Sequence, residues 1–113
     1  MWGMADPVTS VAQYRIKEGL VDEFLAVVDR HWMLLRDLEL VTERRPDVYV
    51  GTERATGGPL VVEIFDWAGA DAAERAHTHP AVSEVWESMG PFAEGRGDRE
   101  AFEFANLTRV RGD

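Results

Sequence analysis

Leu60–Met89 has the sequence LVVEIFDWAGADAAERAHTHPAVSEVWESM and carries the clearest structural signals in the chain. Residues 60–67 are mostly β-branched or aromatic, and the run is too short for a helix, so it predicts a buried strand. Near the end of the stretch the apolar residues recur at helical spacing, at Val82, Val85, Trp86 and Met89. This spacing predicts a helix that packs one face against the rest of the protein and stops at Gly90-Pro91.

The middle of this stretch carries two histidines and a proline, which together predict a break in the helical region. Asp71 is a suitable N-cap for a short helix that ends at about His77. Proline is favoured at the first helical position, and the residue before it avoids helical dihedral angles. We therefore expect a kink at Thr78 and His79, where His79 acts as a cap or turn residue, and a second helical segment over Pro80–Met89.

The rest of the chain supplies a long helix and the other strands. Val8–Ile16 alternates between apolar and polar residues and predicts a strand, and the apolar stripe of the next segment predicts a helix over about Val21–Leu40. Val48–Arg54 is a further strand, joined to residues 60–67 by a Gly-Gly-Pro hairpin that makes the two strands antiparallel neighbours. Arg99–Val110 is the last predicted strand.

The resulting order, β-α-β-β-α-β, is the split βαβ arrangement of ferredoxin-like α+β proteins. The chain of 113 residues has room for one domain. We expect that domain over residues 9–113, built from one antiparallel sheet with two helices on one face. Residues 1–8 are expected to form a flexible arm, because they show no periodicity.

The strand over residues 60–67 is apolar on both faces. Its alternation divides it into Leu60, Val62 and Ile64 on one face and Val61, Phe65 and Trp67 on the other. The helices cover only one face of the sheet, and a monomer would leave the other apolar face in water. We therefore expect a homodimer in which two copies meet sheet against sheet around a two-fold axis.

Composition limits the class of protein and its partners. Hydrophobic residues make up 45% of the chain and charged residues 29%, as in ordinary globular proteins, and no apolar run is long enough to span a membrane. The formal net charge of −9 disfavours nucleic acid and anionic membranes as partners. The absence of cysteine and of a signal peptide favours a cytoplasmic protein.

Three short motifs are specific enough to compare with known families. They are Arg15-Ile16-Lys17-Glu18-Gly19 before a helix that begins Asp22-Glu23-Phe24, then Glu63-Ile64-Phe65-Asp66-Trp67, and then Ala76-His77 with His79-Pro80. Over roughly Thr9–Val110 the chain resembles dimeric α/β barrel proteins of the antibiotic biosynthesis monooxygenase type. The resemblance implies a superfamily that includes cofactor-free monooxygenases of polyketide phenols, haem-degrading enzymes, isomerases and members without known activity.

We expect a small-molecule site in an apolar cleft between the helices and the sheet. Histidine titrates near neutral pH, so His77 is the first candidate for a catalytic base and His31 is the second. The indole N–H of Trp67 and the amide of Gln13 or Asn106 are donors that could hold a phenolate. The full set of expected substrate-binding residues is Trp67, Gln13, Trp32, Val82, Trp86 and Asn106.

The favoured hypothesis is a cofactor-independent monooxygenase of a small electron-rich phenol or quinol. An electron-rich phenolate reduces oxygen directly, so the protein needs only a base, donors that hold the anion, and a dry cavity. The chain has no Gly-x-Gly-x-x-Gly motif, no P-loop and no cysteine cluster, and we expect no nucleotide or metal cofactor. His77 and His79 are two residues apart, which is poor spacing for a metal site on a helix.

Each candidate residue also has a purely structural interpretation, and two other functions stay open. His31 could be a core histidine, His77 could favour the dipole at the end of its helix, and Trp67 could be core filler. Glu63 and Asp66 are expected to pair with arginines or to lie at the sheet edge.

One alternative function is a non-catalytic small-molecule-binding or stress-related protein. The other is haem binding or degradation, for which the resemblance implies a strand-one Asn, a strand-three Trp and a helix-two His. Trp67 and His77 match the last two, whereas strand one offers Ala12 or Gln13 in place of the Asn.

Overall fold

The elements follow one another in the order predicted from the sequence. The structure, a computed structural model, describes residues 6–112. Its elements are β1 (Val8–Arg15), α1 (Val21–Asp37), β2 (Asp47–Thr52), β3 (Pro59–Trp67), α2 (Ala72–His77), α3 (Pro80–Met89), the 3₁₀ helix η1 (Gly90–Phe92) and β4 (Phe102–Leu107). Residues 1–5 of the expected arm lie outside the described residues, and β1 already begins at Val8, the last position assigned to the arm.

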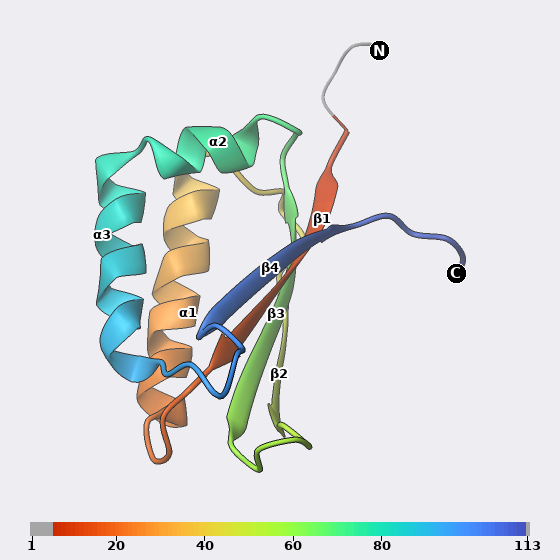
Figure 1. Ribbon diagram of the computed structural model, residues 1–113. Coiled ribbons are helices and arrows are strands. Elements are labelled where there is room, and N and C mark those ends of the chain that lie inside the picture. Colours follow the sequence, from red (N-terminus) through yellow and green to blue (C-terminus); the bar gives the residue numbers. More distant parts are fainter. Residues whose placement is uncertain (1–5, 113) are drawn as a thin grey trace.

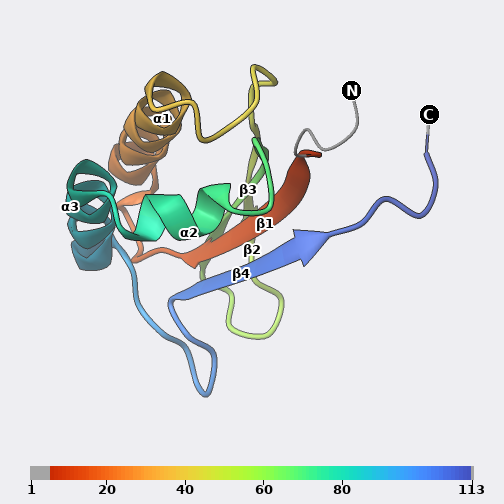
Figure 2. The same cartoon turned by 90° about the horizontal axis from the view of Figure 1, so that it is seen from above.

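The four strands form one antiparallel sheet in the order β2-β3-β1-β4. Helices α1 and α3 stand side by side against one face of this sheet, and α2 crosses above it (Figure 1). The view from above shows all three helices on the same side, while the opposite face carries no helix (Figure 2). This arrangement confirms the ferredoxin-like α+β fold. No helix within residues 6–112 is long and apolar enough to cross a membrane.

Strand β3 shows which of its two apolar faces the helices cover. Val61, Phe65 and Trp67 are buried beneath the helices, together with Glu63, which is fully buried. The other face carries Leu60, Val62 and Ile64, which are only partly buried. The strand pairing places Tyr49 of β2 and Leu107 of β4 on this same uncovered face, and their side chains are 60% and 44% exposed.

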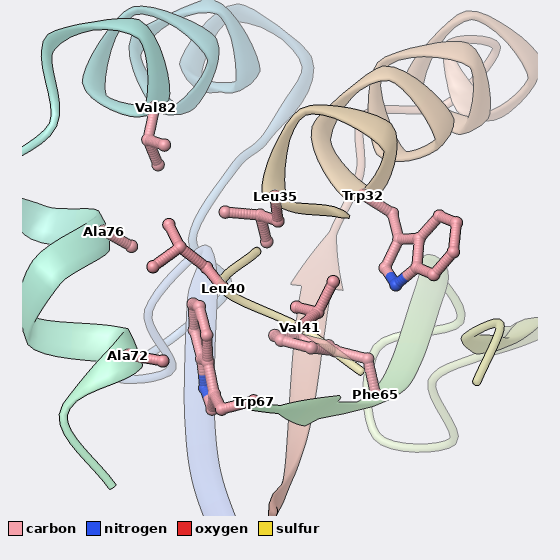
Figure 3. Close-up of a cluster of buried hydrophobic side chains, with 9 residues drawn as sticks. All are labelled: Trp32, Leu35, Leu40, Val41, Phe65, Trp67, Ala72, Ala76 and Val82. Atoms are coloured by element: carbon pink, nitrogen blue, oxygen red, sulfur yellow. The ribbon is translucent and has the colours of Figure 1, made fainter. Parts of the chain in front are cut away.

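A cluster of apolar side chains fixes α1 and α2 over the upper half of the sheet (Figure 3). In this view Trp67 stands upright on β3 beside Ala72 of α2, with Leu40 above it. The cluster consists of Trp32, Leu35, Leu40, Val41, Phe65, Trp67, Ala72, Ala76 and Val82. A second cluster, which includes Tyr14, Phe24 and Met89, packs the lower parts of α1 and α3 on β1. The space between the two clusters and β4 is where the site lies.

Two predicted elements are shorter in the structure than the sequence indicated. Helix α1 ends at Asp37 and not at Leu40, because Glu39 has a positive φ of 59° and the backbone N–H of Leu40 donates to the carbonyl of Leu35. Strand β4 covers only Phe102–Leu107, since the chain before it forms a turn in which the backbones of Arg96 and Arg99 exchange two hydrogen bonds. Side-chain spacing alone does not reveal such ends, because both are set by backbone hydrogen bonds.

Arg15 at the end of β1 is the most buried cation among the described residues, at 1% exposure. Its guanidinium lies 2.8 Å from Glu53 of the β2–β3 hairpin and 2.6 Å from Glu103 of β4, and it donates to the carbonyl of Glu100. Arg96 contacts Glu53 as well, at 3.4 Å. This ion network ties the β2–β3 hairpin and β4 to the end of β1 and holds the lower edge of the sheet together.

Candidate functional site

A cavity of about 310 Å³ lies between the sheet and the helices, at the small end of the range of ligand sites. Its walls come from β1, β3, β4 and all three helices. The lining residues are Ser10, Tyr14, His31, Phe65, Trp67, Ala73, His77, Trp86, Met89, Phe102, Phe104 and Asn106. The cavity is mostly apolar, with a few polar groups that converge on it, which is the usual composition of a small-molecule site.

The cavity opens towards β4. Ser10 and Ala12 of β1 stand opposite Asn106 and Phe104 of β4, so all four side chains point to the helix side of the sheet. The helices do not reach over β4, and Phe104 is therefore 65% exposed and Asn106 is exposed as well. A ligand would enter between β4 and α2, over Phe104.

The structure brings five of the eight residues predicted for the site to this cavity, namely His31, His77, Trp67, Trp86 and Asn106. The other three lie elsewhere. Gln13 points to the uncovered face of the sheet, where it borders a shallow hollow beside Arg99. Trp32 packs in the core with the guanidinium groups of Arg36 and Arg45 over its ring, and Val82 is fully buried in the same core. These three residues are not available to a ligand in the cavity.

His31 and Trp86 join α1 to α3 by a hydrogen bond at the cavity wall. The indole N–H of Trp86 donates to Nε2 of His31 at 2.8 Å, so the proton of the neutral imidazole is on Nδ1. This Nδ1 is buried and has no partner among the described residues. Burial lowers the pKa of His31 to about 4, which keeps the ring neutral at physiological pH. Because Trp86 occupies the basic nitrogen, His31 is poorly placed to accept a proton from a ligand.

His77 ends α2 at the rim of the cavity. Its ring also lies against Trp86, with ring centroids 4.7 Å apart, and its side chain is exposed. Water and a ligand can therefore both reach it. His79 has a different role: its Nδ1 accepts the backbone N–H of Ala81 and caps α3, as expected for a residue before Pro80.

Sequence reasoning missed a buried pair of polar side chains beside the cavity. The hydroxyl of Tyr14 on β1 donates to a carboxylate oxygen of Glu63 on β3 at 2.8 Å. Burial raises the pKa of Glu63 to about 7, although the bond from Tyr14 lowers it, and the charge of Asp29 raises it further. The expectation that Glu63 pairs with an arginine is therefore wrong. Asp66 does pair with one, at 3.7 Å from Arg44, and it also accepts the hydroxyl of Thr9.

A sequence signal for this pair exists in the alternation of the strands. Ser10, Ala12 and Tyr14 alternate on the buried face of β1, and Glu63 interrupts an otherwise apolar buried face of β3. A lone carboxylate among residues that must be buried indicates a special environment. The same alternation accounts for Phe65 and Phe102 in the cavity wall, whereas Ala73 and Met89 depend on how the helices pack.

Two kinds of bound group can be compared with the residues present. Among residues 6–112 no three His, Asp or Glu side chains gather in a way that could hold a metal ion. For haem, Trp67 and His77 do line one cavity, but the residues that β1 turns towards the helices are Ser10, Ala12 and Tyr14, and none of them is an amide.

Comparison with known proteins places this geometry in a recurrent fold. No protein-family model and no curated protein sequence matches the chain. Among solved structures it is similar to SnoaB, a cofactor-independent oxygenase from Streptomyces nogalater, with 19% identity over 96% of this chain and 97% of that one and a TM-score of 0.66. An antibiotic biosynthesis monooxygenase matches with 15% identity over 92% and 99% of the two chains and a TM-score of 0.64.

A conserved protein from Methanosarcina mazei Go1 is also similar, with 14% identity over 92% of each chain and a TM-score of 0.63. The chain therefore has the fold of antibiotic biosynthesis monooxygenase-like proteins, which confirms the fold that the sequence motifs implied. At these identities the comparisons establish the fold alone.

Proposed function

We propose that the protein is a cofactor-independent monooxygenase that oxidises a small electron-rich aromatic, a phenol or quinol, in the cavity. The observation that carries the proposal is the cavity itself: aromatic walls formed by Phe65, Trp67 and Trp86 enclose it, and His77 and Asn106 stand at its mouth. Flat aromatic ligands suit such walls, because aromatic rings pack favourably against one another. Its fold is also that of SnoaB, a cofactor-independent oxygenase.

The reaction balances without a cofactor. A phenol with a hydrogen at the ring carbon opposite its hydroxyl reacts with O₂ to give a quinone and water. The phenol first loses its O–H proton, and the phenolate then transfers an electron to O₂. Recombination forms a carbon–oxygen bond and a peroxide. Loss of the C–H proton and cleavage of the O–O bond leave one oxygen atom in the quinone and release the other as water. The substrate supplies every electron.

The positions of the residues support a separate role for each of them. His77 takes the phenol proton, since it borders the cavity and no other side chain is hydrogen-bonded to it among the described residues. The amide of Asn106 and the indole N–H of Trp67 hold the phenolate oxygen. His31 does not act as the base, because its basic nitrogen accepts the Trp86 N–H and its pKa is lowered to about 4.

The test is oxygen consumption by metal-free and flavin-free protein with a panel of polycyclic phenols. Incorporation of one atom from ¹⁸O₂ into the quinone identifies monooxygenation. His77→Ala should lower kcat on the order of 10²-fold or more, the usual contribution of a general base. The matched control is His79→Asn, which keeps a cap on α3 and lies outside the cavity, and it should leave kcat unchanged.

The outcomes separate the functions that remain open. Full activity of His77→Ala would refute the role of His77. Binding of phenols without oxygen uptake would favour the non-catalytic binding protein. A Soret band and tight binding on addition of haem, with no phenol oxidation, would favour haem binding or degradation as the function.

We also propose that the protein is a homodimer built on the uncovered face of the sheet. The support is the row of apolar side chains there, which includes Val62, Ile64 and the exposed Tyr49. Charged substitutions at Val61 or Phe65 would not test this, because both side chains lie beneath the helices. Ile64→Asp should instead convert a dimer to a monomer in sedimentation experiments. Met33→Asp, a matched change at a residue of α1 that is 50% exposed, should leave the mass unchanged.

A further inference from the structure

Tyr14 and Glu63 form a buried polar pair beside the cavity, and the proposed reaction gives this pair no role. Glu63 is fully buried, yet one of its carboxylate oxygens has no partner among the described residues. Its other oxygen accepts the hydroxyl of Tyr14, which is itself 1% exposed and lines the cavity. A buried carboxylate with only one of its oxygens hydrogen-bonded costs stability, so its presence beside a ligand-sized cavity points to a role for it.

Tyr14 is the link between Glu63 and a ligand. Its ring packs edge-on against Phe102 and Phe104, both of which belong to the cavity wall. Its hydroxyl reaches across to β3 at Glu63, which precedes the cavity residue Phe65 by two positions on the same face. Tyr14 therefore connects the cavity wall to Glu63, which does not itself line the cavity.

The hydrogen-bond chemistry of the pair has two states. A tyrosine hydroxyl has one proton and two lone pairs, and an ionised carboxylate can only accept. When Glu63 is ionised, the Tyr14 proton must point at it, and Tyr14 can offer only a lone pair to a ligand. When Glu63 is protonated, its own O–H can donate to Tyr14, and the Tyr14 proton is then free to turn towards the ligand.

We propose that Tyr14 recognises an oxygen substituent on the aromatic ligand, and that the protonation of Glu63 sets whether Tyr14 accepts from a hydroxyl or donates to a carbonyl. Tyr14 would contact the ligand, and Glu63 would act as a positioning residue. The inference rests on the proposed function in its choice of ligand class: a quinol substrate carries a second hydroxyl besides the one that His77 deprotonates, and the quinone product carries a carbonyl. The quinone carbonyl can be bound only in the state with protonated Glu63. The phenol hydroxyl donates to Tyr14 when Glu63 is ionised and can only accept when Glu63 is protonated, so it favours the ionised state.

The surroundings of Glu63 raise its pKa, so that its carboxyl group gains or loses a proton near neutral pH. The groups that act on it are Tyr14 of β1 and Asp29 of α1, and its neighbour on β2 is the apolar Val48. Burial and the charge of Asp29 raise the pKa of Glu63 to about 7 against the opposing effect of the Tyr14 bond. Burial, with the nearby charge of Glu63, raises the pKa of Tyr14 well above 10, so Tyr14 keeps its proton throughout.

The test compares the binding of two ligands built on the same two fused rings, 2-naphthol and 1,4-naphthoquinone, by titration calorimetry between pH 5.5 and 8.5. The chain has no cysteine with which the quinone could react. We expect the Kd of 2-naphthol to fall as the pH rises through about 7, and the Kd of the quinone to rise, each by roughly five- to tenfold.

Two variants isolate the pair. Glu63→Gln should remove the pH dependence of both Kd values, and Tyr14→Phe should weaken both ligands roughly five- to tenfold at their favoured pH. Thermal unfolding of each variant shows that it is folded. Parallel pH profiles for the two ligands, or a Glu63→Gln protein that keeps the opposite slopes, would overturn the inference. Opposite slopes without any phenol oxidation would support it and refute the proposed oxygenase instead.

Discussion

The pH dependence of stability offers a direct test of the buried His31. Its side chain is 3% exposed, it is held neutral, and burial lowers its pKa from the usual 6.5 to about 4. In the unfolded chain the same ring becomes charged below pH 6.5, while in the folded protein it stays neutral until about pH 4. The unfolded state therefore binds more protons in this interval, and its stability relative to the folded state increases as the pH falls.

The size of the effect follows from the two pKa values. A difference between 6.5 and about 4, at about 1.36 kcal/mol per pH unit, corresponds to roughly 3 kcal/mol. This contribution to the free energy of unfolding is fully present above pH 6.5 and is lost as the pH falls through about 4. For a domain of 113 residues it is a large share of a typical total stability of about 5–15 kcal/mol.

The perturbation is His31→Gln, whose side-chain oxygen can still accept the Trp86 N–H but cannot titrate. Urea unfolding of the wild-type protein and the variant, followed by tryptophan fluorescence, gives both free energies between pH 3.5 and 7.5. Carboxylates titrate in both proteins, so the difference between the curves isolates His31. We expect the wild-type protein to lose roughly 3 kcal/mol relative to the variant between pH 6.5 and 4. Parallel curves would refute the assignment of a buried, neutral His31.

Three further predictions concern other parts of the fold. Arg15→Met should lower the midpoint of urea unfolding, because Glu53 and Glu103 lose the cation that both contact; an unchanged midpoint would contradict the network. Gly57→Ala should cost about 1–2 kcal/mol, since Gly57 has a φ of +75°, whereas Gly51→Ala should cost less in the same assay. The raised pKa of Glu63 stabilises the folded wild-type protein fully below pH 4.5, and this stabilisation is lost as the pH rises through about 7. Above pH 7, Glu63→Gln should therefore have a higher free energy of unfolding than the wild-type protein. The same difference between variant and wild type at pH 5 and at pH 8 would contradict this.

Much of the fold was predictable because the signals that specify it are local. The strand over Pro59–Trp67 and the break before Pro80 both follow from side-chain branching, alternation and the restricted dihedral angles of proline. The hairpin glycines and the helical spacing of α3 complete the βαββαβ order. The ends of α1 and β4 were not predictable in this way, because a backbone turn at Glu39 and the Arg96–Arg99 pairing set them.

The candidate site depended more on tertiary structure. Residue type alone indicated His77, His31 and Trp86, and all of these line the cavity. The same reasoning also selected Gln13, which strand alternation turns to the other face of the sheet, and Trp32, which α1 turns into the core. A residue's chemistry and the alternation of side chains along a strand can be read from the sequence, but which face of a strand or helix is covered is fixed only when elements distant in the chain pack together.

The order of the elements, and the histidines and aromatics available to a site, could be read from the amino-acid sequence. The way in which those groups pair depends on the tertiary structure. It joined His31 to Trp86 across 55 positions of the chain, which removes the basic nitrogen of His31, and it joined Tyr14 to Glu63 across 49 positions. Both partnerships depend on burial and on hydrogen-bond geometry between separate elements. These long-range quantities, which set the pKa values of the buried groups, have no counterpart in local sequence patterns.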